Sequence, residues 1–102
     1  MKTPGLAAHE LVMVAGILRQ HPEVTSAKLF GSRAKGSYRP GSDVDLAIWG
    51  NVDGIRAQTI AAELDELPLP YRFEVQPFGL IQLPALRDHI ERVGISVYPS
   101  LA

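Results

Sequence analysis

The run from Asp43 to Trp49 constrains the fold more than any other part of the sequence, because aliphatic residues occupy every second position. Side chains of a β-strand point alternately to its two faces, so one face of this run suits a core. The residues of that face are Val44, Leu46 and Ile48. The second, more polar face would carry the carboxylates Asp43 and Asp45, then Ala47 and Trp49. The pattern therefore predicts a half-buried strand that begins with a pair of acids.

Helix-like and strand-like segments alternate along the rest of the chain. We expect helices over 4–20, from Asp53 to the turn before Pro68, and from Pro84 onward, since proline suits a first helical turn. We expect strands over 24–30, 71–76 and 95–98, where β-branched and aromatic residues gather. The expected core includes Leu64, Leu67, Leu86 and Ile90. This order predicts an α/β (α+β) fold with a mixed β-sheet flanked by helices.

Length and composition fit one small folded domain. The chain has 102 residues, 46% of them hydrophobic and 21% charged, so we treat 1–102 as a single domain. A formal net charge of -1 argues against a direct DNA-binding surface, which needs a clear excess of basic residues. The sequence holds no cysteine, and it offers no secretion signal and no apolar stretch long enough for a membrane. We therefore expect a cytoplasmic location.

The two aspartates at the start of the strand are the first candidate functional residues. Carboxylates at positions i and i+2 lie on one face and repel each other unless a cation sits between them. Mg²⁺ accepts one or two protein carboxylates and completes its shell with water and substrate phosphate. Asp43 and Asp45 fit that demand, although an isolated pair of this kind is more often a solvated strand end.

A second candidate stands at the end of the preceding strand, where Gly31 and Ser32 follow Phe30 directly. Glycine lets a backbone approach a ligand closely, and a helical turn that begins there directs free amides toward an anion. A triphosphate would suit such a turn. The same dipeptide could instead do no more than end the strand.

The two candidates together resemble the signature of the DNA polymerase β-type nucleotidyltransferases. The resemblance rests on residues 31–36 (Gly-Ser-Arg-Ala-Lys-Gly) and 42–46 (Ser-Asp-Val-Asp-Leu). It is closest to the minimal nucleotidyltransferases, or MNT proteins, which are encoded beside HEPN-domain toxins and act as their antitoxins. The resemblance implies the nucleotidyltransferase fold.

The resemblance also implies roles for particular residues. Asp43, Asp45 and Glu74 would be catalytic and would hold two Mg²⁺ (or Mn²⁺) ions, with Glu74 drawing the proton from the attacking hydroxyl. Family members more often carry aspartate at the place of Glu74. The nucleotide-binding residues implied are Gly31, Ser32, Arg33, Lys35 and Ser42.

The implied reaction is transfer of AMP from ATP to a hydroxyl. The implied acceptor is a tyrosine of a HEPN toxin. We also expect this protein to form a homo- or hetero-oligomer. Two other functions remain open. The protein could mask a partner by contact alone, or it could modify a small molecule such as an aminoglycoside, although the chain has no room for the domain that grips such an acceptor. Trp49 could stack on a base or serve packing.

Overall fold

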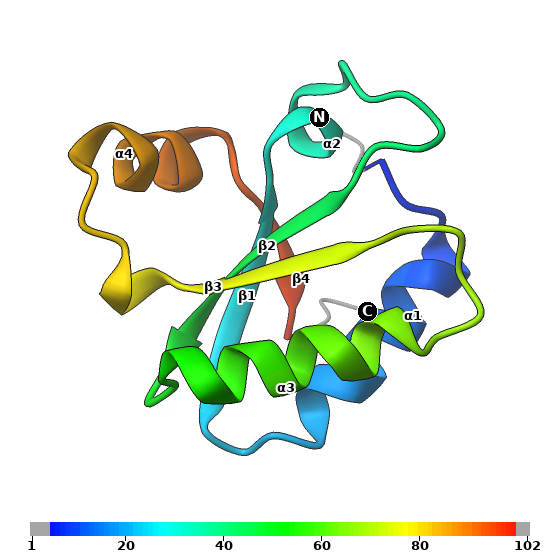
Figure 1. Ribbon diagram of the computed structural model, residues 1–102. Helices are drawn as coiled ribbons and strands as arrows, with labels where there is room; N and C mark the ends of the chain where they lie inside the picture. Colours follow the sequence, from blue (N-terminus) through cyan, green and yellow to red (C-terminus); the bar gives the residue numbers. More distant parts are fainter. Residues whose placement is uncertain (1–4, 100–102) are drawn as a thin grey trace.

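The computed structural model describes residues 5–99, which form four strands and the helices around them (Figure 1). The helices are α1 (Ala8–Arg19), α2 (Ser32–Lys35), α3 (Gly54–Asp65), the 3-10 turn η1 (Phe78–Leu80) and α4 (Pro84–Val93). The strands are β1 (Val24–Phe30), β2 (Val44–Gly50), β3 (Phe73–Pro77) and β4 (Ile95–Tyr98). The predicted elements are all present in the described residues.

Local chemistry accounts for the ends of these elements. The Asp53 carboxylate accepts a hydrogen bond from the Arg56 amide at 2.8 Å and caps α3, as the sequence predicted. Pro84 stands in the first turn of α4. The expected start of the first helix at Pro4 lies outside the described residues. Strand β2 begins one residue later than predicted, so Asp43 lies just before it.

The four strands form one mixed sheet in the order β3-β2-β1-β4. Strand β1 runs antiparallel to β2 and to β4, whereas β3 runs parallel to β2 after the crossover through α3. The end of β1 and the beginnings of β2 and β3 therefore meet at one end of the sheet. The two candidate segments of the sequence, the turn after β1 and the acids of β2, come together there.

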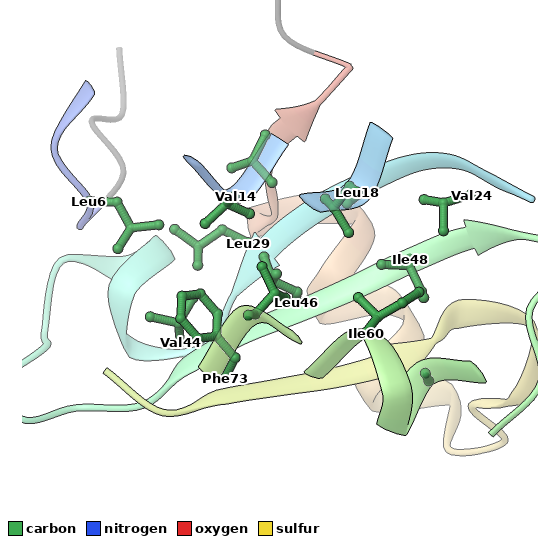
Figure 2. Close-up of a cluster of buried hydrophobic side chains, with 14 of the residues drawn as sticks. Leu6, Val14, Leu18, Val24, Leu29, Val44, Leu46, Ile48, Ile60 and Phe73 are labelled. Atoms are coloured by element: carbon green, nitrogen blue, oxygen red, sulfur yellow. The ribbon is translucent and has the colours of Figure 1, made fainter. Parts of the chain in front are cut away.

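Helices α1 and α3 cover one face of the sheet and enclose the larger core (Figure 1). Figure 2 shows labelled side chains of α1, α3, β1, β2 and β3 pointing toward one another. Members of this core with no exposed surface include Val14, Leu18, Leu29, Leu46 and Ile60. The predicted alternation of β2 is confirmed on this face, because Val44, Leu46 and Ile48 all belong to the core.

The second face of the sheet also carries an apolar layer. It contains Ile90 and Leu86, which the sequence predicted as core residues, but the sequence did not predict a separate layer on this face. Helix α4 and the segment of η1 cover this face. Phe78, Ile81 and Ile90 from the cover form a smaller cluster with Phe30 and Ala47 of the sheet. Trp49, at the end of β2, stacks on Phe78 with 4.5 Å between ring centroids. The more polar face of β2 is thus polar only at its beginning, where the acids lie. No helix in the described part of the chain is long and apolar enough to span a membrane.

Candidate active site

The turn after β1 places Gly31 and Ser32 at the end of the sheet. Gly31 has φ +77°, and its carbonyl accepts hydrogen bonds from the Ala34 and Lys35 amides at 3.2 and 3.1 Å. The Gly36 amide donates to the Ser32 carbonyl at 2.9 Å and closes the turn. The first amides of a helical turn have no intrahelical acceptor, so the amides at the start of this turn are candidate donors to an anion.

Gly31 lies directly against the carboxylate of Asp45. Phe30 and Asp45 are partners in the register of β1 and β2. A Cβ placed on Gly31 would meet Oδ2 of Asp45 more closely than side chains tolerate. The absence of a side chain at this position is therefore what lets the turn and the acid approach each other.

The three predicted acids gather at the start of β2 and β3. Asp45 and Glu74 are partners in the parallel register, and Asp43 is an exposed residue just before β2. Burial raises the pKa of Asp45 from its ordinary 3.8 to about 6, and the negative charges of Glu74 and Asp43 and a hydrogen bond with Glu74 add to the rise. The structure thus places a half-buried carboxyl beside two other acids, and both burial and these acids disfavour its ionised form.

This donor set fits a hard divalent cation that shares its coordination with a substrate. Within residues 5–99, no group of three or more acids or histidines is placed so that it could hold a metal ion by itself. Mg²⁺ rarely uses such a group and is bound through one or two carboxylates and phosphate oxygens. A cation beside Asp45 would relieve the repulsion from its neighbours. Asp43, Asp45 and Glu74 are the residues that could hold it.

The remaining predicted nucleotide-binding residues differ in their surroundings. Lys35 is exposed at the end of α2, beside the turn. The Ser42 hydroxyl accepts a hydrogen bond from the Arg39 amide at 2.9 Å and thereby closes the loop before Asp43. Arg33 is only 2% exposed, and its guanidinium donates to backbone carbonyls, so it presents no open face to a nucleotide.

Sequence reasoning missed Phe30, a neighbour of Asp45, and His89, which contacts Phe30. Phe30 is buried across the strand pair from Asp45. His89, on α4, meets the Phe30 ring edge-on with 6.4 Å between centroids. No local pattern in the sequence joins a residue of the last helix to the first strand, and only the covering of the second face by α4 brings them together.

The arrangement combines candidate donors for an anion with candidate ligands for a cation. The turn supplies amides and a hydroxyl, and the acids on the adjoining strands supply anionic oxygens within reach of the same place. The site lies at the end of an open sheet, where a second molecule can approach.

Comparison with solved structures supports this fold. A chain of the toxin-antitoxin complex with AMP-PNP superposes with a TM-score of 0.74 at 18% identity, covering 93% of this chain and 76% of that one. A chain of the tri-AMPylated Shewanella oneidensis HEPN toxin in complex with MNT antitoxin gives 0.70 at 17% identity, over 90% and 71%. The toxin-antitoxin MntA-HepT gives 0.71 at 16% identity, over 92% and 74%. At such identities the likeness establishes the fold alone.

A search of curated proteins found no match to the sequence. The family model described as polymerase beta, nucleotidyltransferase matches residues 13–100, which include the turn after β1 and all three acids. The chain therefore belongs to the polymerase β nucleotidyltransferase family.

Proposed function

We propose that this protein transfers AMP from ATP to a tyrosine hydroxyl of a HEPN-domain toxin and so acts as its antitoxin. The observation that carries the proposal is the meeting of Asp43, Asp45 and Glu74 beside the Gly31 turn. The structural neighbours include a tri-AMPylated HEPN toxin in complex with an MNT antitoxin, which supports both the reaction and the partner. We extend the proposal to the whole of residues 1–102 as one domain acting in the cytoplasm.

In the proposed reaction the tyrosine oxygen attacks the α-phosphorus of ATP. A new oxygen–phosphorus bond forms, the bond between the α-phosphorus and the bridging oxygen to the β-phosphate breaks, and pyrophosphate leaves. Glu74 accepts the proton of the tyrosine hydroxyl, because its carboxylate is exposed to a partner and lies on β3, beside Asp45 of the neighbouring strand. Ser32 and the amides of its turn hold the phosphates of ATP.

Asp43, Asp45 and Glu74 would hold two Mg²⁺ or Mn²⁺ ions. When bound, these ions neutralise the phosphates and ease loss of the hydroxyl proton. The exposed Lys35 adds positive charge at the edge of the same site. Asp43 and Glu74 are exposed, so an acceptor brought by a partner can reach them.

The decisive experiment incubates the protein with α-labelled ATP, Mg²⁺ and the HEPN-domain protein encoded beside it. Label should enter the HEPN protein, and Asp43→Asn should abolish both the labelling and the neutralisation of toxicity. The control is Asp88→Asn, a matched change on the exposed face of α4 that should leave both intact. Neutralisation that persists in Asp43→Asn without labelling would identify the masking function instead. Label found only in an added aminoglycoside would identify the small-molecule enzyme.

A further inference from the structure

We propose that Arg33 is a positioning residue that ties the backbone before Asp43 to the turn that begins at Gly31. This inference rests on the proposed function, because it concerns the spacing between the groups that would hold phosphate and metal. It replaces the direct contact with nucleotide that the sequence resemblance implied for Arg33.

The first support is the set of hydrogen bonds to the loop before β2. The Arg33 guanidinium donates to the Ser42 carbonyl twice, from Nε at 3.2 Å and from Nη2 at 3.0 Å. Nη2 also lies 3.3 Å from the Pro40 carbonyl. The peptide that links Ser42 to Asp43 is therefore held from one side by a planar fork.

The second support is a pair of hydrogen bonds that join Arg33 to Gly5, in the segment before α1. Nη1 of Arg33 donates to the Gly5 carbonyl at 2.6 Å, and the Gly5 amide donates back to the Arg33 carbonyl at 3.2 Å. Gly5 has little room for a side chain, because an added Cβ would lie 2.8 Å from the Tyr38 ring. Arg33 thus joins three separate segments of the chain.

The third support is the burial of the charge. The Arg33 guanidinium lies between the Tyr38 and Tyr71 rings, 4.8 and 4.3 Å from their centroids. Taking a charge out of water is costly, and here carbonyl dipoles and aromatic faces offset that cost. A lysine could not replace this arrangement, since its ammonium is a compact point charge without a planar fork.

The geometric consequence concerns the active site. Arg33 follows Ser32 directly in the chain, and its fork holds the residue that precedes Asp43. One side chain therefore sets how far the phosphate-binding turn lies from the first metal-holding carboxylate. In phosphoryl transfer, where positioning supplies much of the rate, a displacement of about 1 Å can reduce turnover by about 100-fold.

The test compares Arg33→Lys with Arg19→Lys, the same chemical change at an exposed position far from the site. Three quantities are measured: backbone amide chemical shifts of the metal-free protein, Mn²⁺ affinity with a non-hydrolysable ATP analogue, and kcat and KM for ATP in AMP transfer. For Arg33→Lys we expect shifted Ser42 and Asp43 amides, Mn²⁺ affinity reduced about fivefold or more, and kcat reduced about 10- to 100-fold with little change in KM. Arg19→Lys should match the wild type.

Other outcomes would overturn the proposal. A raised KM for ATP with normal kcat and unshifted amides would mean that Arg33 contacts the nucleotide after all. If Arg33→Lys does not fold, the same measurements on Tyr38→Leu decide, because this change uncovers one side of the guanidinium. Tyr38→Leu should shift the Asp43 amide and weaken Mn²⁺ binding, and unchanged values would refute the role. If the wild type transfers no AMP, the proposed function fails, whereas the amide shifts and Mn²⁺ affinity still test Arg33.

Discussion

The carboxyl group of Asp45 is the most perturbed acid of the site. Its pKa of about 6 exceeds the ordinary 3.8, which an unfolded chain would show. A folded-state pKa raised in this way means that folding favours the protonated form. The metal-free protein should therefore lose stability as the pH rises from about 4 through 6, where the folded carboxyl ionises against its neighbours.

We expect Asp45→Asn to stabilise the metal-free protein at pH 8 and to have little effect at pH 4. The gain should be about 0.5 to 2 kcal/mol, because solvent screens a carboxyl that is only half buried. Urea unfolding in EDTA at the two pH values measures it. Asp88→Asn, on the exposed face of α4, should produce no such difference between the two pH values. An equal effect of Asp45→Asn at both pH values would contradict the electrostatic explanation.

Glu74 is the acid in which this chain departs from the aspartate more common in its family. If it takes the proton of the acceptor, Glu74→Gln should leave folding and most ATP binding intact, because Asp43 and Asp45 remain. Transfer of AMP should fall to about one per cent or less, the usual scale of general-base catalysis. Glu74→Asp should retain far more. Incorporation of labelled AMP at saturating ATP measures both, and near-normal transfer by Glu74→Gln would place the base on the partner.

For individual residues, the sequence predicted a functional role where a residue type in a given pattern has one dominant chemical use. Asp43 and Asp45 could be singled out because paired carboxylates at positions i and i+2 repel each other unless a cation sits between them. Glu74 was implied by the resemblance to the nucleotidyltransferases, which need a third acid on a neighbouring strand. Arg33 could not be understood in the same way. A basic residue beside a phosphate turn suggests a contact with phosphate, and only the fold reveals that its fork reaches carbonyls instead.

Among the elements, the turn between β1 and α2 brings Gly31 against the carboxylate of Asp45. Gly31→Ala would meet a positive φ and the Asp45 carboxylate, which can swing away from its place. Gly50→Ala is a matched control at the other end of the sheet, where φ is +128° and the obstacle is the Glu23 carbonyl.

Both glycine variants should lower the free energy of unfolding by at least about 1 to 2 kcal/mol, since neither backbone conformation suits alanine. Only Gly31→Ala should lose the increase in melting temperature produced by ATP with Mn²⁺, because it displaces Asp45. Thermal melts of the two variants with and without these ligands provide the comparison. Retention of the full ligand-induced increase by Gly31→Ala would mean that the contact with Asp45 does not matter for binding.

The elements themselves were largely predictable, and the failures have a common cause. Strand β2 was assigned one apolar face, yet Ala47 on its other face is fully buried. Residues of η1 and α4 bury Ala47 on this face. The apolar residues around Phe78 have no regular spacing, so the sequence does not indicate that this segment packs against the sheet. The spacing of apolar residues predicts which face of a strand is apolar. It does not predict whether a distant segment without regular spacing packs against the other face.

For the molecule as a whole, the two apolar layers on opposite faces of the sheet should both stabilise the fold but should differ in their effect on AMP transfer. Ile60 is fully buried in the larger core, on α3, and its loss would leave a cavity away from α4. Ile90 is equally buried, in the smaller cluster that includes Phe30, the register partner of Asp45.

Ile60→Ala and Ile90→Ala should each lower the free energy of unfolding by about 2 to 5 kcal/mol. At a temperature where both variants remain folded, Ile60→Ala should transfer AMP at close to the normal rate, whereas Ile90→Ala should be slower because Phe30 loses support. Urea denaturation and labelled-AMP transfer at 15 °C measure the two effects. Equal loss of AMP transfer in both variants would show that the two layers do not differ in their effect on the active site.

All the groups proposed for chemistry come from one end of the sheet, and this has a practical use. The opposite end carries the exposed Asn51, which follows β2 directly and lies six residues along the chain from Asp45, or about 20 Å at the rise of a strand. The chain contains no cysteine, so Asn51→Cys would create a single thiol for attaching a fluorophore or spin label. Paramagnetic Mn²⁺ bound at the acids would broaden the signal of a label at that range. A reporter fixed there could follow metal loading and partner arrival in real time without occupying the place where either happens.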